Sequence, residues 1–172
     1  NTVVGSQAMQ NGTSAFNTAI GYQALKAVTG DNNTGVGYAS LLSNTSGRWN
    51  TGLSQSSLQS NTTGSYSTAI GYAALYSNTT ASENTAVGYQ ALYTNTTAVE
   101  NTALGYQAGY GNTTGAGNTF VGRKAGTGNT TSGAQTMVGS GAGQVTTGEN
   151  NTFVGQSSGY YVSSGAKNTI LG

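Results

Sequence analysis

The stretch Asn84-Thr85-Ala86-Val87-Gly88-Tyr89-Gln90-Ala91-Leu92 decides the fold of this chain, because close copies of it recur about every 17 residues. The copies begin at Asn1, Asn17, Asn33, Asn50, Ser67, Asn84, Asn101, Asn118, Gln135 and Asn151, and an eleventh opens at Asn168. Almost every copy starts with Asn-Thr-x-(Val/Ile/Leu)-Gly. A fixed period of this length is typical of stacked arrays in which each repeat contacts mainly its neighbours. We therefore expect residues 1–172 to form a single repeat array.

One copy predicts two short strands and two turns. Thr85 and Val87 are β-branched and suit a strand over 84–88. A second short strand is expected over 89–92, and residues 93–100 are rich in turn formers. Glycine is too frequent for helix, and the apolar residues do not follow a 3.6-residue period. The predicted fold is all-β, a parallel β-solenoid of about ten coils whose thin core favours association with other copies.

Stacking the coils in register places like residues on like. The fourth position of each copy is aliphatic: Val4, Ile20, Val36, Leu53, Ile70, Val87, Leu104, Val121, Val138, Val154 and Leu171. This regularity argues against a disordered low-complexity chain. The second position is always Thr, and its parity with the aliphatic position predicts that both face inward. An inward Thr column argues against an ice-binding face. The Asn residues that open the copies are expected to hydrogen-bond from coil to coil, as stacked amides do.

Two positions of the repeat exchange their volumes along the chain. In the second to sixth copies the third position is small and the ninth is leucine, as in Ala86 and Leu92, and the first copy departs mildly with Val3 and Met9. From Asn118 onward the third position holds Phe120, Met137 and Phe153, and the ninth holds Gly126, Gly143 and Gly159. Close packing keeps the total volume constant. We infer that the two positions share one packed layer, within a chain or between chains.

The composition leaves little room for catalysis or nucleic-acid binding. Charged residues make up 5% of the chain and the net charge is +1, whereas nucleic-acid binding needs clustered Lys and Arg. There is no His and no Cys, and the four acids are scattered. We expect no enzyme, no cofactor and no metal site. No apolar run approaches the roughly 20 residues that a membrane span requires.

Asn-x-Ser/Thr is the most frequent surface motif. It occurs at Asn11, Asn32, Asn44, Asn61, Asn78, Asn95, Asn112, Asn129 and Asn150. The 17-residue spacing from Asn44 to Asn129 places six of these residues in one line along a turn edge. As N-glycosylation acceptors they would coat one ridge of the rod. The alternative is turn chemistry, since Asn and Thr favour turns.

Aromatic residues form partial columns. The tyrosines fall into two: Tyr22, Tyr38, Tyr72, Tyr89 and Tyr106, then Tyr76, Tyr93, Tyr110 and Tyr160. Such rows are expected to line a seam between subunits, and the alternative is contact with glycans or another protein. Arg48-Trp49 interrupts the regular copies, either as a local plug or as an exposed contact.

The stretch Asn17-Thr18-Ala19-Ile20-Gly21-Tyr22-Gln23-Ala24-Leu25, with its echoes at Asn84 and Asn101, resembles the YadA-like head repeats of trimeric autotransporter adhesins. It is also similar to repeats of phage tail fibres and bacterial surface proteins. The resemblance implies a left-handed β-roll, three chains side by side, and attachment to surfaces. The chain departs from the family in its Thr column and its longer period.

The expected function is a structural, non-enzymatic segment of an extracellular fibre or adhesin, located on a cell or virion surface. The alternatives are a glycosylated filament subunit that polymerises end to end and a carbohydrate-binding tail-fibre shaft. The expected partners are other copies of the chain, with glycans or a host surface as further possibilities. The chain begins on a repeat boundary and stops within a repeat, which is expected of a piece of a longer array or of a stacking unit.

Overall fold

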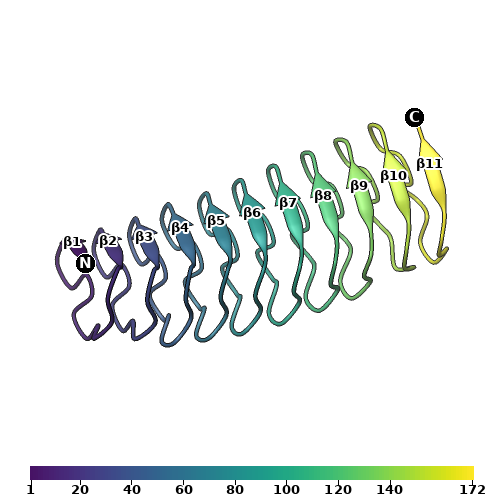
Figure 1. Cartoon of the computed structure of the whole chain (residues 1–172). Helices are drawn as coiled ribbons and strands as arrows, with labels where there is room; N and C mark the ends of the chain where they lie inside the picture. Colours follow the sequence, from purple (N-terminus) through teal and green to yellow (C-terminus); the bar gives the residue numbers. More distant parts are fainter.

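The computed structural model describes all 172 residues as an elongated parallel β-solenoid (Figure 1). Each strand has three residues, and no helix is present. The strands are β1 (Thr2–Val4), β2 (Thr18–Ile20), β3 (Thr34–Val36), β4 (Thr51–Leu53), β5 (Thr68–Ile70), β6 (Thr85–Val87), β7 (Thr102–Leu104), β8 (Thr119–Val121), β9 (Thr136–Val138), β10 (Thr152–Val154) and β11 (Thr169–Leu171). They form one 11-stranded sheet in chain order. The predicted fold class is confirmed.

The strands pair with no shift of register. Between β6 and β7, for example, Thr85 pairs with Thr102 and Val87 with Leu104. Each coil therefore places its Thr and its aliphatic residue directly over those of the next coil. At about 4.7–4.9 Å per coil, ten coils make a rod roughly 50 Å long.

The second predicted strand is absent. Gln90 and Leu92 have φ angles of 53° and 49°, so the backbone turns left-handed at alternate residues where a strand would stay extended. The segment is nevertheless bonded to both neighbouring coils. The Gln90 N–H donates to the Tyr72 carbonyl at 2.9 Å, and the Leu92 N–H donates to the Ala108 carbonyl at 3.0 Å. The alternating backbone thus points successive N–H groups in opposite directions along the axis.

The middle residue of each strand, which is the third residue of the repeat, faces the core, and its two neighbours do not. Ala86 and Phe120 are fully buried, whereas Thr85 and Val87 are half-buried on the opposite side. Ile70 and Leu104, in the aliphatic column, remain 37% and 38% exposed. The prediction that the Thr and aliphatic columns face inward is therefore wrong. Both columns lie on the outer face of the sheet.

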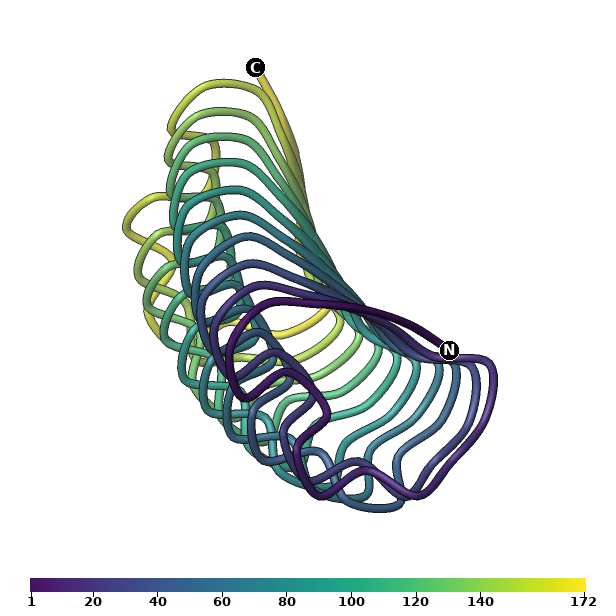
Figure 2. The same ribbon diagram turned by 90° about the vertical axis from the view of Figure 1, so that its left-hand side faces the viewer.

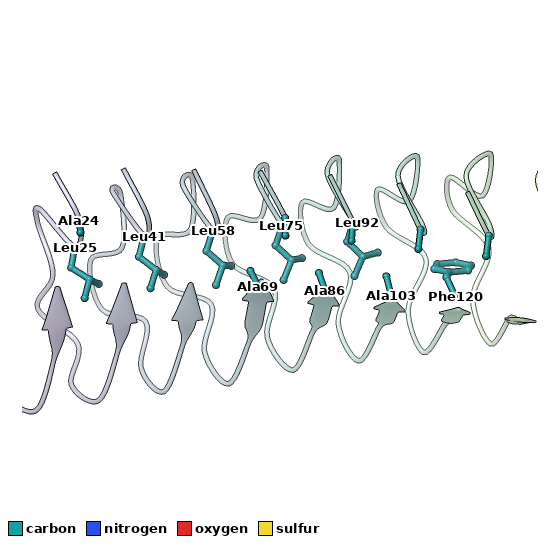
Figure 3. Packing of buried hydrophobic residues seen from close by; sticks show 14 of the residues in the cluster. Ala24, Leu25, Leu41, Leu58, Ala69, Leu75, Ala86, Leu92, Ala103 and Phe120 are labelled. Carbon is teal, nitrogen blue, oxygen red and sulfur yellow. The ribbon is translucent and has the colours of Figure 1, made fainter. Parts of the chain in front are cut away.

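The volume exchange between the third and ninth positions occurs inside one chain. Figure 3 shows Leu75 and Leu92 reaching from the turn side toward Ala69 and Ala86 on the strands, while Phe120 reaches back from its own strand. A Cβ added to Gly126 would collide with the Phe120 ring. The predicted shared layer is confirmed, and it is the core of the solenoid.

The coils rotate as they stack. Viewed nearly along the rod, successive coils fan round from the N-terminal to the C-terminal end (Figure 2). This rotation is the twist expected of strands made of L-amino acids. Gly88 follows β6 at a φ of 136°, and a side chain there would collide with the Gly105 carbonyl of the next coil. Ser54 is the one non-glycine residue of this column, at a φ of 120°.

Candidate interaction surfaces

Six of the nine predicted glycan acceptors lie in the interior. Asn44, Asn61, Asn78, Asn95, Asn112 and Asn129 are fully buried and do form one line. The Asn95 Nδ2 donates to Asn78 Oδ1 at 3.0 Å and to the Ala98 carbonyl at 3.0 Å. A glycan on Nδ2 would replace one of these hydrogens and would have no path to solvent. The prediction of an exposed ridge is wrong at these positions, and the amides serve the turn and the stack instead.

The opening residues of the copies form a second buried column. The Asn101 N–H donates to Asn84 Oδ1 at 2.9 Å, and the Asn118 N–H donates to Asn101 Oδ1 at 2.9 Å. The Asn84 Nδ2 donates to the Ala98 carbonyl of the adjacent turn, one coil further along the axis, at 2.8 Å. The predicted coil-to-coil bonding is present, although its donor is the backbone N–H and not a second amide. The side-chain amides also join the start of each strand to the adjacent turn of the next coil.

The other three acceptors lie on the surface. Asn11, Asn32 and Asn150 are exposed. Asn32 and Asn150 have φ angles of 61° and 59°, a conformation that asparagine adopts more readily than most residues. Glycosylation of these three residues stays a prediction.

The tyrosine columns are stacked ring on ring. In the first column Tyr22 stacks on Tyr38 with centroids 5.6 Å apart, and Tyr72, Tyr89 and Tyr106 stack at 5.2 and 5.3 Å. In the second, Tyr76, Tyr93 and Tyr110 stack at 5.1 and 5.2 Å. Tyr160 instead meets Tyr161 edge-on. Because most ring faces cover one another, these columns offer mainly their edges and hydroxyls to a ligand.

Burial within the stack of the second tyrosine column changes the pKa of its middle residue, Tyr93. Burial and then the neighbouring Tyr76 and Tyr110 raise the pKa of Tyr93 above its usual value of 10.0. The cause is that a phenolate there would lose hydration and be repelled by any charge on the stacked rings.

The outer sheet face carries no charged residue over β2 to β7, and it combines a polar Thr column with an apolar column. Its aliphatic column runs between the Thr column and the first tyrosine column. No hydroxyl of the Thr column donates a hydrogen bond within the chain, as Thr85 and Thr102 illustrate. The outward Thr column removes one objection to ice binding. The twist in Figure 2 nevertheless keeps the column from forming a flat array.

Arg48-Trp49 is an exposed contact and not a plug. Trp49 is 47% exposed, and its ring stacks on Tyr66 with centroids 5.0 Å apart and planes 6° from parallel. Both residues stand directly before an opening residue, at a corner where the backbone is left-handed, with φ angles of 53° and 58°. Sequence reasoning missed the Trp49–Tyr66 pair, although the shared offset before Asn50 and Ser67 was a usable signal.

No enclosed pocket is present, and no group of three or more acidic, His or Cys residues is placed to hold a metal ion. Glu83 and Glu100 occupy equivalent corners of neighbouring coils and are exposed. The chain has no helix of the length and hydropathy needed to cross a membrane. Comparisons with protein-family models, with curated proteins and with solved structures found no match.

Proposed function

We propose that this chain is a structural, non-enzymatic segment of an extracellular fibre or adhesin, acting as a stiff rod. The observation that carries the proposal is the continuity of bonding between coils. Each strand pairs with the next in register, the left-handed segment that includes Gln90 and Leu92 is bonded to both neighbouring coils, and buried amides add further bonds between coils. A rod bonded at several points around every coil resists bending and shear. Stiffness is what a fibre segment needs in order to hold an attachment point away from its anchor.

The outer sheet face is where we propose that copies of the chain associate. It combines half-exposed aliphatic residues such as Ile70 and Leu104 with the exposed rings of Tyr72, Tyr89 and Tyr106. A contiguous apolar strip is unusual on a monomer. The absence of charge on this strip removes the repulsion that two identical faces would otherwise meet. The resemblance to adhesin heads favours three chains side by side and a place on a cell or virion surface.

A filament coated along its line of six acceptors is less well supported, because those asparagines are buried. A carbohydrate-binding shaft that uses the tyrosine columns is also less well supported, because most of the ring faces cover one another.

The experiment is the oligomeric state of the purified chain, measured by light scattering after size exclusion and by electron microscopy. Leu104→Lys places a charge on the outer face and is expected to convert the assembly to monomers. The matched control is Thr97→Lys, since Thr97 is exposed on a turn away from that face. A wild-type chain that is monomeric at all concentrations would overturn the association. Turnover of a polysaccharide would overturn the non-enzymatic assignment.

A further inference from the structure

In the N-terminal coils of the chain, the corner directly before the opening residue of a copy often carries an aromatic side chain. The column reads Phe16, Asn32, Trp49 and Tyr66 in successive coils. Backbone bonds fix this alignment: the Asn32 N–H donates to the Ala15 carbonyl at 3.3 Å, and the Trp49 N–H donates to the Asp31 carbonyl at 3.3 Å. Phe16 and Trp49 therefore stand two coils apart in one column, with Asn32 between them.

We call the space over the shorter Asn32 side chain, between the side chains of Phe16 and Trp49, the notch. Two coils span about 9.4–9.8 Å. A flat ring in contact with two aromatic walls needs about 7–8 Å between the wall planes. A puckered pyranose ring, whose C–H groups point out of both faces, needs more. The notch is thus wide for a nucleobase and suited to one sugar ring.

Phe16 and Trp49 form the walls of the notch and Asn32 forms its floor, and each of the three has a free surface. Tyr66 covers one face of Trp49, and the other face points along the axis toward Asn32. Phe16 is 77% exposed and stacks on no other ring. The Asn32 side chain is exposed and makes no hydrogen bond within the chain, as the bonds of its neighbours Asp31 and Asn33 illustrate. An amide with a free donor and a free acceptor suits adjacent sugar hydroxyls.

The left-handed corner fixes where these side chains leave the coil. Phe16, Asn32 and Trp49 have φ angles of 59°, 61° and 53°, and later coils keep the same conformation with other residue types, as at Glu83 and Ala134. The coil sets this conformation and not the aromatic residues, so successive corner side chains leave the backbone in the same direction. Phe16 and Trp49 are 77% and 47% exposed there and gain nothing from core burial.

We propose that the Phe16–Asn32–Trp49 notch binds a single pyranose residue of a carbohydrate chain. Phe16 and Trp49 stack on the two faces of the ring, Tyr66 holds the Trp49 plane, and the Asn32 amide hydrogen-bonds to hydroxyls at the ring edge. The site is open, so binding by one chain is weak, and copies in a fibre would add through avidity. This binding is additional to the structural role and does not depend on self-association.

The test uses the fluorescence of Trp49, which is the only tryptophan of the chain. Cellotetraose, maltotetraose and triacetylchitotriose are titrated into the full chain, with adenosine as a flat-ring comparison. At least one of the oligosaccharides is expected to shift the emission of Trp49 and to saturate, and adenosine is not.

Variants then locate the binding by titration calorimetry with the responding sugar. Trp49→Ala and Phe16→Ala are each expected to weaken binding about tenfold or more, as loss of a stacking wall worth about 1.4 kcal/mol would do. Tyr161→Ala is the matched control, because Tyr161 is 88% exposed and lies far from the notch in the array. The proposal is overturned if no oligosaccharide shifts the emission, or if either wall variant binds like the wild type. A stronger response to adenosine would assign the notch to a flat ring and would also overturn it.

Discussion

Gln135 is one methylene longer than the asparagine that opens most copies, and the stack is interrupted there. Its Oε1 is buried without a hydrogen-bond partner. At equivalent sites Asn17 Oδ1 accepts the Asn33 N–H at 2.7 Å, and Asn118 Oδ1 accepts the Gln135 N–H at 2.9 Å. The longer side chain carries its oxygen past the place where the Asn151 N–H would meet it. One methylene therefore costs the column one coil-to-coil bond.

Gln135→Asn is expected to stabilise the chain. It restores an acceptor for the Asn151 N–H and removes an unpaired buried oxygen, a change worth about 1–3 kcal/mol. Urea unfolding would show a higher midpoint with an unchanged slope. Asn118→Gln, the reverse change one coil earlier, should destabilise by a similar amount, and a neutral result for both variants would show that water satisfies these groups.

The stacked Tyr93 predicts sensitivity to alkaline pH. Its pKa is raised in the folded state by burial and by Tyr76 and Tyr110. The unfolded chain therefore ionises first, so the stabilisation is complete below the ordinary pKa of about 10 and is lost as the pH rises through the higher folded value. In Tyr93→Phe, stability is expected to fall less between about pH 9 and about pH 11. Urea midpoints at each pH measure this, and Tyr161→Phe should behave as the wild type does.

At the scale of the structural elements, the coil is held together by two buried amide columns and one apolar layer. A variant of Asn95 can test whether its line of asparagines serves as a buried hydrogen-bonding column or as a row of glycan acceptors. Asn95→Ala leaves the buried Asn78 Oδ1 without its donor and removes one of the two amides that donate to the Ala98 carbonyl. We expect a loss of about 1–3 kcal/mol in unfolding free energy.

Thr97→Ala is the matched variant for Asn95→Ala. It destroys the same Asn-x-Thr motif but changes only an exposed side chain. If Asn95 serves only as a hydrogen-bonding residue of the buried column, Thr97→Ala produced in the native host should leave the unfolding free energy unchanged. If Asn95 carried a stabilising glycan, both variants would lose the same mass and the same stability.

The apolar layer predicts a compensating pair. Phe120→Ala removes the largest side chain of its coil and is expected to cost about 3–5 kcal/mol. Adding Gly126→Leu should recover part of this loss, because Leu92 and Ala86 fill the same layer in that manner. Gly126→Leu alone should be severely destabilising, because its side chain would collide with the Phe120 ring. A double-mutant cycle in denaturant gives the coupling energy, and additive effects would contradict the shared layer.

The sequence predicted this layer correctly and the orientation of the strand incorrectly. Alternation shows that Thr85 and Val87 share a side, but a three-residue strand has only one residue of the other parity, and that residue is often alanine. Hydrophobicity therefore favoured the wrong face. The exchange of volume between Phe120 and Gly126 indicated the correct core-facing position, since only facing positions in a packed interior need to conserve volume. The left-handed residues Gln90 and Leu92 were not predictable, because neither type usually adopts that conformation.

For the whole molecule, the period was sufficient to predict a solenoid, whereas the composition did not identify its interaction sites. Surface columns depend on which turn residues point outward, as at Asn95 and Trp49, and the period alone does not determine this. The repeat also predicts that the rod is modular. Excision of residues 84–100 joins Glu83 to Asn101 and removes one full coil.

The shortened chain is expected to keep its fold and to lose only one unit of coil-to-coil stability. Circular dichroism should keep its shape, and the rod should shorten by about 4.7–4.9 Å. Removing only residues 92–100 deletes Asn95 and Leu92 while keeping the strand, and should abolish cooperative unfolding. Equal tolerance of both deletions would contradict a stack in strict register.

The rotation of successive coils in Figure 2 has a mechanical consequence for any assembly of these rods. The outer face winds about the long axis, so two straight rods laid side by side would touch over a few coils and then diverge. Rods that keep contact along their whole length must wrap around one another like the plies of a rope. Pulling on such a rope presses its strands together, so a bundle built on this face would tighten under tension.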